Sequence, residues 1–167
     1  MAELGTLEFV IATARGVMAS LALSYEVETG NPINETELKC MAENIYFEAR
    51  GQGQAGWLAV AQVTQNRVDD RRFPNTICEV VKQGLTYASG DPIRNKCQFS
   101  WYCDGLSDKP KDQRAWAKAI AVAEDVFFSY GLSINTVEGA TFYHATTVDP
   151  AWNLEYVVTI EDHIFYR

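Results

Sequence analysis

The sequence of 167 residues has no long apolar run and no excess of basic residues, and each absence excludes a class of protein. The longest uncharged run near the N-terminus is the ten residues between Arg15 and Glu26, whereas a membrane-spanning helix needs about 20. Lysine and arginine total 14 against 22 aspartates and glutamates, a formal net charge of −8. Because nucleic acids and anionic membrane surfaces require clustered basic side chains, we expect neither partner and no stable membrane span.

Metal sites and phosphate-binding loops are also missing as sequence patterns. The only histidines are His144 and His163, and the cysteines lack the spacing of two to four residues that is usual at zinc sites. Residues 51–56 contain glycines, but their spacing is wrong for a phosphate-binding loop and no Lys-Ser or Lys-Thr follows. We therefore expect no metal and no other cofactor.

The four cysteines can pair as disulfides in three ways. Cys97 and Cys103 flank a short segment and would most easily close a small loop, which leaves Cys40 and Cys78 to form the second bridge. Buried free thiols are the alternative, because cysteine is also common in hydrophobic cores. Disulfides would favour an oxidising destination for the protein.

A hydrophobic fraction of 47% and 20 aromatic side chains (4 Trp, 8 Tyr and 8 Phe) are enough for a substantial core. We expect one domain over residues 34–167, preceded by an N-terminal amphipathic helix and linker over residues 1–33. The first segment contains Glu3 and Glu8 instead of basic residues, which is unlike a signal peptide, although its apolar surface leaves an export role open. A monomer is the default expectation.

Hydrophobic periodicity and turn residues predict an α+β domain in which helices pack against a small antiparallel sheet. Helices are expected between Asn34 and Gly51, from Trp57 to Val68, from Ile77 to Gly84 and from Asp112 to Gly131. Strand character is expected over Cys97–Tyr102, Ala140–His144, Tyr156–Ile160 and His163–Tyr166.

Glu48 is the most informative single residue. It follows Met41 by seven residues and Ile45 by three, so it lies on the apolar face of its predicted helix. A carboxyl group there is either paired with a cation or desolvated, and desolvation raises its pKa toward values that suit a general acid. The alternative is a structural ion pair with Arg50 or Arg67.

Side chains that suit sugar binding are concentrated between the third and fourth cysteines. Gln98, Ser100 and Trp101 lie in this segment, where aromatic faces can stack on sugar rings and amides can bind hydroxyl and acetamido groups. The alternative is a hairpin whose aromatic residues belong to the core. Tyr143 and His144 form a further pair that could move a proton or bind a ligand, although a lone histidine at a strand end is more often structural.

Several longer motifs follow one another along residues 38–167. They are Asn44–Gly51 (NIYFEARG), Gly56, Ala59–Val63 (AVAQV), Asn66–Val68 (NRV), Phe73–Cys78 (FPNTIC), Cys97–Trp101 (CQFSW), Thr141–Ala145 (TFYHA), Pro150 and Trp152. Together they closely resemble the spore-cortex-lytic (SleB/CwlJ-type) cell-wall hydrolase family. Because several motifs are long and all stand in order, the resemblance is specific.

This resemblance implies a lysozyme-like α+β fold, with a helical lobe and a small antiparallel sheet similar to those of lytic transglycosylases. It also implies cleavage of the glycan strand of bacterial peptidoglycan between N-acetylmuramic acid and N-acetylglucosamine. Glu48 would be the catalytic acid, because it stands in the family's Glu-Ala-Arg-Gly motif. Two positions depart from the family pattern, since Gln52 replaces a usual glutamate and Trp57 a usual glutamine.

A single supported carboxyl group favours a lytic transglycosylase, because ordinary glycosidases need two carboxylates. Glu48 would protonate the glycosidic oxygen and then deprotonate the muramic 6-hydroxyl, which closes a 1,6-anhydro ring. Tyr143 could support the developing oxocarbenium charge. The side chains expected to line a groove between the helices and the sheet are Asn66, Gln98, Ser100, Trp101 and Tyr143.

Three alternatives remain open. A second carboxylate, Asp91 or Asp104 for instance, would make the protein a hydrolytic muramidase. A zinc-dependent N-acetylmuramoyl-alanine amidase would need three metal ligands, and a non-catalytic glycan-binding module would have no use for a desolvated glutamate. The expected place of action is the cell wall, in the periplasm or outside the cell, and a phage endolysin released from the cytoplasm would also fit.

Overall fold

A computed structural model describes residues 34–129, 132 and 134–167. The amphipathic helix and linker predicted over residues 1–33 lie outside the described residues, as does Gly131, the predicted end of the last helix. Residues 35–167 form one compact unit. None of the helices in the described ranges is long and apolar enough to cross a membrane.

Within the described ranges, four α-helices form where the hydrophobic periodicity predicts them, although the second begins at Gln54 instead of Trp57 and the third ends at Val81 because Gly84 belongs to a strand. They are α2 (Glu35–Ala49), α3 (Gln54–Asp69), α4 (Ile77–Val81) and α5 (Gln113–Ser129). Local capping explains two of the starts, because Thr76 accepts a hydrogen bond from the backbone of Glu79 and Asp112 accepts from the backbones of Arg114 and Ala115. The N-cap of α3, Gly53, has no side chain with which to cap its helix.

The prediction of a strand over Cys97–Tyr102 is wrong. Residues Ser100–Cys103 form a 3₁₀-helix, η1, and only Cys97 belongs to a strand. The disulfide between Cys97 and Cys103 joins residues six apart, so the chain must turn back within this segment. The strands β1 (Gly84–Thr86) and β2 (Pro92–Cys97) instead form an antiparallel hairpin that was not predicted, because its residues are mostly exposed and show no apolar alternation.

The C-terminal strands form a three-stranded antiparallel sheet. It contains β3 (Phe142–Ala145), β4 (Tyr156–Ile160) and β5 (His163–Tyr166) in the order β3-β5-β4. β4 and β5 have the predicted limits, and β3 starts two residues later than predicted because the backbone of Ala140 turns to bond Val137. Tyr143 pairs with Phe165 on β5, which fixes the face of the sheet on which its side chain lies.

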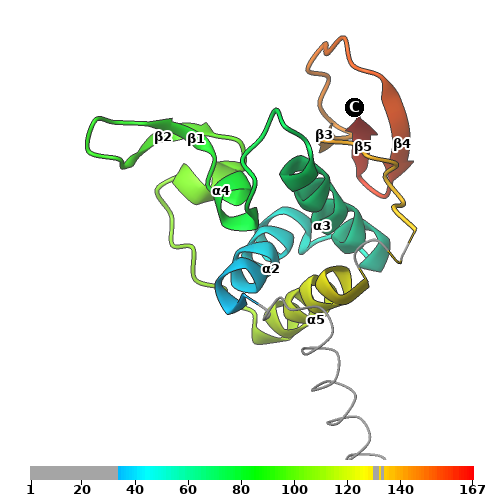
Figure 1. Cartoon of the computed structure of the whole chain (residues 1–167), viewed down its shortest axis with the longest axis horizontal. Helices are drawn as coiled ribbons and strands as arrows, with labels where there is room; N and C mark the ends of the chain where they lie inside the picture. Colours follow the sequence, from blue (N-terminus) through cyan, green and yellow to red (C-terminus); the bar gives the residue numbers. More distant parts are fainter. Residues whose placement is uncertain (1–33, 130–131, 133) are drawn as a thin grey trace, which may run out of the picture. The chain divides into compact units, whose positions relative to one another are not determined.

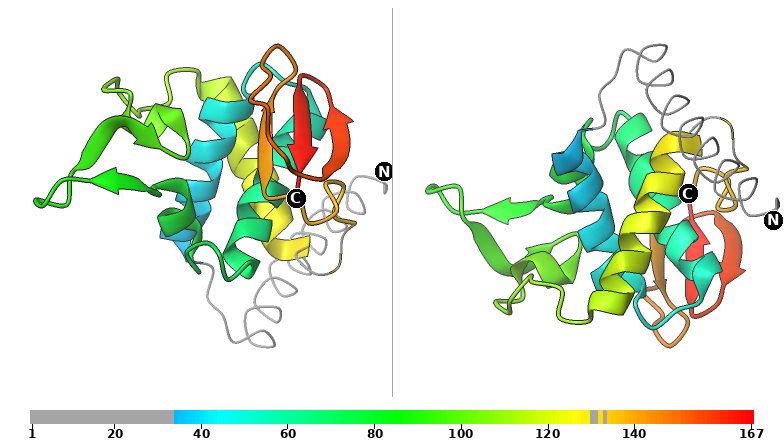
Figure 2. Two further views of the ribbon diagram at one scale, coloured as in Figure 1. Left: turned by 90° about the horizontal axis from the view of Figure 1, so that it is seen from above. Right: turned by 90° about the horizontal axis from the view of Figure 1, so that it is seen from below.

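The helices lie between the two β-structures (Figures 1 and 2). α2 contacts α3, α4 and α5, and so forms the centre of the helical lobe. The β1–β2 hairpin extends from the side of α4, while the sheet β3-β5-β4 lies on the opposite side, against α3. This arrangement of helices and small antiparallel sheets is the predicted α+β architecture.

Two hydrophobic clusters hold this arrangement together. The larger contains the buried faces of α2, α4 and α5 and part of α3, and Met41 and Ile45 within it are fully buried. The smaller lies between α3 and the sheet and includes Val63 and Phe165. Tyr143 packs against both clusters, so its ring lies at the junction of the helical lobe and the sheet.

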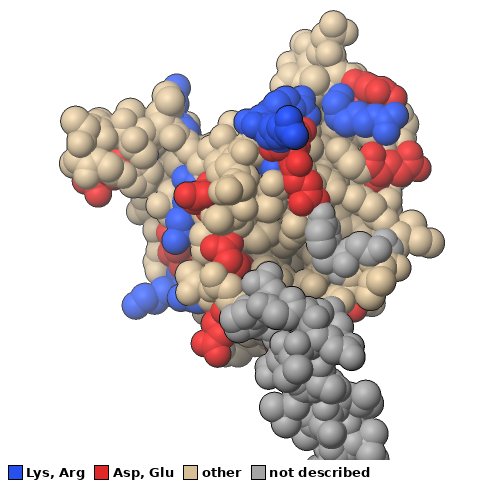
Figure 3. Space-filling view, viewed as in Figure 1, with Lys and Arg blue, Asp and Glu red and all other residues tan. Residues whose placement is uncertain are grey.

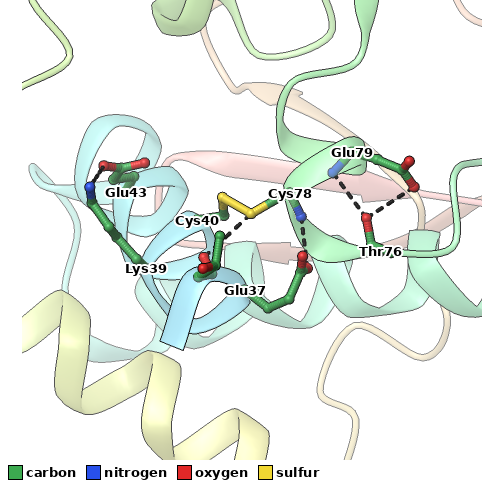
Figure 4. Close-up of a disulfide and its surroundings, with 8 residues drawn as sticks. Glu37, Lys39, Cys40, Glu43, Thr76, Cys78 and Glu79 are labelled. Carbon is green, nitrogen blue, oxygen red and sulfur yellow. Dashed lines mark hydrogen bonds and ion pairs between the residues drawn. A yellow bond between two sulfur atoms is a disulfide. The ribbon is translucent and has the colours of Figure 1, made fainter. Parts of the chain in front are cut away.

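The four cysteines form two disulfides, Cys40–Cys78 and Cys97–Cys103, which is the pairing that the spacing predicts. The first joins α2 to α4, and Figure 4 shows the carboxylate of Glu37 beside it, accepting a hydrogen bond from the backbone N–H of Cys78 at 2.9 Å. The second closes the short loop between β2 and η1.

Charges of both signs are interspersed on the face shown in Figure 3. Basic and acidic side chains lie next to each other in small groups. Ion pairs join Arg72 to Asp70 and Arg167 to Glu155. On this face, the residues that the structure describes form no broad basic area.

Candidate active site

Glu48 lies in the last turn of α2, beside the fully buried Met41 and Ile45 of the same helix face. Its side chain is half-buried, and loss of hydration raises the pKa of its carboxyl group above the ordinary value of 4.5. Two interactions oppose this effect: a hydrogen bond from Tyr143 and the positive charge of Arg67. Burial is the largest influence, so the group holds its proton at a higher pH than an exposed glutamate does.

Tyr143 brings the sheet into contact with this carboxyl group. Its phenol donates a hydrogen bond to Oε2 of Glu48 at 2.9 Å, across 95 residues of sequence. Burial and the neighbouring carboxylate raise the pKa of Tyr143 well above 10, so the phenol keeps its proton and acts as a donor. The pair therefore joins the end of α2 to β3.

Arg67 is the charged residue that influences this pair. It lies in the last turn of α3, and its Nε donates a hydrogen bond to the backbone oxygen of Thr141 at 2.7 Å. Its guanidinium carbon lies 5.0–5.9 Å from the ring centres of Phe73, Phe99 and Phe142. An arginine held by aromatic rings in this way stays charged and well packed without a carboxylate.

The predicted alternative, an ion pair of Glu48 with Arg50 or Arg67, does not occur. None of the ion pairs between described residues includes Glu48. Arg50 instead lies over the ring of Tyr46 and donates to its hydroxyl at 3.0 Å. Arg67 acts on Glu48 through its charge at longer range and favours the ionised carboxylate. The sequence signal that could have identified Arg67 is an arginine that follows Val60 and Val63 on the apolar face of α3.

Stacking on a sugar requires an exposed aromatic ring, and Trp101, in the segment between the last two cysteines, is buried instead. Trp101 is only 8% exposed, stacks on Phe47 with ring centres 4.7 Å apart and donates its indole N–H to Asn44 at 3.1 Å. Its rings are therefore part of the core beneath the end of α2. Gln98 and Ser100 are exposed. A role in binding substrate stays a prediction for all three residues. Because Trp101 is buried, it would influence the substrate only through neighbouring residues.

Asn66 is bonded to the segment that leads into β3. Its Nδ2 donates to the backbone oxygen of Ala140 at 2.8 Å, and its Oδ1 accepts from Asn135 at 2.6 Å. Both ends of the amide are thus used within the protein. Its predicted role in binding substrate is untested, and these contacts favour a role in holding the residues before β3.

The two histidines differ in their surroundings. His144 lies within hydrogen-bond distance of the Tyr166 hydroxyl, 3.0 Å from Nε2, and stacks on its ring. His163 is buried, and its ring meets the edge of Tyr143 with centres 5.1 Å apart. Burial lowers the pKa of His163, so it is neutral near neutral pH. Among the described residues, no group of three or more histidine, cysteine or acidic side chains could hold a metal ion.

Neither Asp91 nor Asp104 is among the groups that shift the pKa of Glu48. Asp91 accepts a hydrogen bond from Ser89 in the turn of the β1–β2 hairpin, and Asp104 accepts from the backbone of Leu106 after η1. Within the described part of the chain, the influences on the pKa of Glu48 are burial, Tyr143 and Arg67, and none of these is a second acid.

The family model of cell wall hydrolases (Hydrolase_2) matches residues 51–166, which is more than half of the chain. The chain belongs to the cell wall hydrolase family. The resemblance seen in the sequence motifs is thereby confirmed, although the matched range begins three residues after Glu48. Members of this family act on the cell wall, so the family also confirms that this chain is an enzyme of that class.

Curated relatives of the chain are spore cortex-lytic enzymes. The one from Bacillus cereus is 39% identical over 51 residues, which are 30% of this chain and 20% of the relative. The one from Bacillus subtilis is 30% identical over 56 residues, 34% of this chain and 18% of the relative. The matched part of the chain thus spans about a fifth of the length of these relatives.

Two solved structures share the fold. The catalytic domain of the Bacillus cereus SleB protein superposes with a TM-score of 0.52 at 22% identity, covering 82% of this chain and 94% of that one. The catalytic domain of the germination-specific lytic transglycosylase SleB from Bacillus anthracis gives a TM-score of 0.58 at 24% identity, covering 82% and 98%. At these identities the likeness concerns the fold, and it confirms the predicted lysozyme-like α+β class.

Proposed function

We propose that the chain cleaves the glycan strand of peptidoglycan between N-acetylmuramic acid and N-acetylglucosamine as a lytic transglycosylase, with Glu48 as both acid and base. The observation that carries this proposal is the Glu48–Tyr143 pair. A carboxyl group with a raised pKa is held by a phenol at the junction of helices and sheet, and no second carboxylate among the described residues shifts that pKa. Membership of the cell wall hydrolase family supports the substrate class.

In the first step, protonated Glu48 donates its proton to the glycosidic oxygen as the bond from C1 of the muramic residue to that oxygen breaks. The raised pKa suits this role, because an acid that keeps its proton near working pH is a better donor. Electron density from the ring oxygen stabilises C1, which gains oxocarbenium character. The leaving N-acetylglucosamine gains the proton at its O4.

In the second step, the Glu48 carboxylate removes the proton of the muramic 6-hydroxyl, and O6 bonds to C1 to close the 1,6-anhydro ring. The proton returns to Glu48, so one residue completes the cycle and no water is consumed. The hydrogen bond from Tyr143 and the charge of Arg67 both favour the ionised carboxylate that exists between the steps. Tyr143 therefore assists Glu48 through this hydrogen bond, in addition to any support of the oxocarbenium charge.

Digestion of purified murein with the full chain, with products identified by mass spectrometry, tests this proposal. Fragments that end in 1,6-anhydromuramic acid and that disappear with Glu48→Gln are the expected result. Glu43→Gln is the matched control, because Glu43 lies on the same helix and burial also raises its pKa, but it pairs with Lys39. This control should keep its activity.

Other products would overturn the proposal in different ways. Reducing muramic ends would show a hydrolytic muramidase, and released stem peptides would show an amidase. Full activity of Glu48→Gln would remove Glu48 from the mechanism. Binding of murein without any fragments would indicate a non-catalytic glycan-binding module. Action at the cell wall, outside the cytoplasm, follows from the proposed substrate, whereas the comparisons lend no support to a phage endolysin.

A further inference from the structure

The loop that follows Glu48 is held by the turn between β4 and β5. Glu161 in this turn accepts a hydrogen bond from the backbone N–H of Gly53 at 2.6 Å, across 108 residues of sequence. Gly53 is the N-cap of α3 and has no side chain of its own for capping. Glu161 thus supplies the missing cap from the sheet, and its negative charge also interacts favourably with the N-terminus of the helix.

Two glycines make room for this carboxylate. A Cβ atom at Gly53 would lie 2.6 Å from Oε1 of Glu161, and one at Gly56 would lie 2.7 Å from Oε2. Gly53 has a φ of −77°, which any residue adopts easily, so its backbone does not require glycine. A larger residue would instead push the Glu161 carboxylate away, so glycine at this position is needed to keep the contact.

Neighbouring residues strengthen the same contact. Gln52 and Asp162 bond reciprocally, with the amide of Gln52 donating to Oδ2 at 3.3 Å and accepting from the backbone N–H of Asp162 at 3.2 Å. Trp57 donates its indole N–H to the backbone oxygen of Gln52 at 2.9 Å. The two positions at which the chain departs from the family pattern, Gln52 and Trp57, therefore lie in one connected set of contacts.

The contacts of the β4–β5 turn with Gly53 and Gln52 fix the sheet against the helices. His163, two residues after Glu161, packs against the ring of Tyr143, and β5 pairs along the whole of β3. Glu48 stands five residues before Gly53, on the other side of the same loop. Glu161 also adopts a φ of +52°, a strained conformation for a glutamate that its bond to Gly53 helps to offset.

We propose that Glu161 is a positioning residue, which caps α3 and thereby holds the sheet that carries Tyr143 at the distance where Tyr143 bonds Glu48. This inference extends the proposed function, on which its activity readouts rest. Two charged or titratable groups lie next to the pair: Arg67 on α3 influences the pKa of Glu48, and His163 on β5 contacts the ring of Tyr143. His163 is in turn influenced by Asp162, Glu161 and His144. Of these, Glu161 and Asp162 reach the helices through Gly53 and Gln52.

Variants of the full chain at position 161 test the inference. Glu161→Asn suits the left-handed backbone but is too short to reach Gly53, whereas Glu161→Gln keeps an acceptor at the same reach. Glu138→Asn is the matched control, because Glu138 is an exposed glutamate with a φ of +45° outside these contacts. The readouts are the pKa of the Glu48 carboxyl group by carbon-13 NMR and the pH profile of murein cleavage.

We expect Glu161→Asn to raise the pKa of Glu48, because the hydrogen bond from Tyr143 that lowers it is weakened. The same variant should lower kcat about tenfold with little change in KM, the size of effect expected for a lost hydrogen bond to a charged group. Glu161→Gln should stay within about threefold of the unchanged protein, and Glu138→Asn should match it. In a Tyr143→Phe background, Glu161→Asn should have no further effect on kcat.

Several results would overturn the inference. A Glu161→Asn variant that loses thermal stability but keeps the pKa of Glu48 would show a purely structural role, as would effects on kcat that add to those of Tyr143→Phe. Should Glu161→Asn fail to fold, Gly53→Ala provides the same test, because its methyl group displaces the Glu161 carboxylate. The pKa of Glu48 measured by NMR tests the inference even if the unchanged protein proves inactive on murein. Failure of the inference can therefore be distinguished from failure of the proposed function.

Discussion

Replacing Glu48 with glutamine should stabilise the folded protein at neutral pH while it abolishes glycan cleavage. Burial raises the pKa of Glu48 above 4.5, the ordinary value that it regains in the unfolded chain. The protonated carboxyl group of Glu48 therefore stabilises the folded protein fully below the unfolded-state pKa. This stabilisation is lost as the pH rises through the folded-state pKa. Above pH 4.5 ionisation therefore favours the unfolded chain, because the folded site disfavours the charged carboxylate.

The size of the effect follows from this linkage. Each unit by which the pKa is raised corresponds to about 1.4 kcal/mol of lost stability once the group is ionised. In a domain of this size, 1 kcal/mol changes the melting temperature by about 3 to 5 °C. Glutamine has nearly the same shape, and its Oε1 can still accept the hydrogen bond from Tyr143, so removal of the charge is the main change.

Thermal unfolding of the full chain at a series of pH values is the appropriate assay. Glu48→Gln should melt several degrees above the unchanged protein at neutral pH, and the two curves should converge at about pH 4. Glu124→Gln, an exposed change on α5, controls for the loss of one negative charge. A Glu48→Gln variant that is less stable at neutral pH, or whose difference does not vary with pH, would refute the reasoning.

Three further predictions concern neighbouring features. Tyr143→Phe removes a hydrogen bond that lowers the pKa of Glu48, so the alkaline limb of the pH–rate profile should move to higher pH and kcat should fall about tenfold; an unmoved limb would contradict this. Arg67→Met leaves the backbone oxygen of Thr141 unpaired and removes the cation from its three rings, which should cost about 2 to 4 kcal/mol in urea unfolding, whereas a loss under 1 kcal/mol would argue against these contacts. Replacing Cys40 and Cys78 with serine opens a loop with a sequence separation of 38, and chemical denaturation should show a loss of about 4 kcal/mol, while an unchanged midpoint would show that this bridge does not stabilise the fold.

The helices and the C-terminal strands could be predicted from sequence because their signals are local. Apolar residues at helical spacing mark α2, α3 and α5, and Asp112 caps α5 as expected. The β1–β2 hairpin could not be predicted in this way, because its strands are short, polar and exposed. The aromatic run after Cys97 was misread as a strand because periodicity does not register a disulfide that closes a loop of six residues.

The residues of the candidate site likewise include some that could be predicted from sequence and some that could not. Glu48 could be singled out from sequence because a carboxylate on the apolar face of a helix is unusual, and Tyr143 because it stood in a motif beside a histidine. Trp101 was expected to face sugar, yet it is buried against Phe47, since composition does not distinguish an aromatic residue on a surface from one in a core.

The sequence by itself determined which segments become helices, which face of α2 carries Glu48 and to which family the chain belongs, and it favoured the cysteine pairing that the structure shows. Those properties depend on the spacing of residues along the chain. Only the tertiary structure decided that Tyr143 bonds Glu48, that Arg67 is held by aromatic rings instead of a carboxylate, and that Glu161 caps α3. The hydrogen bonds of Arg67, Tyr143 and Glu161 join residues 74 to 108 positions apart, and they form only when the sheet packs on α3.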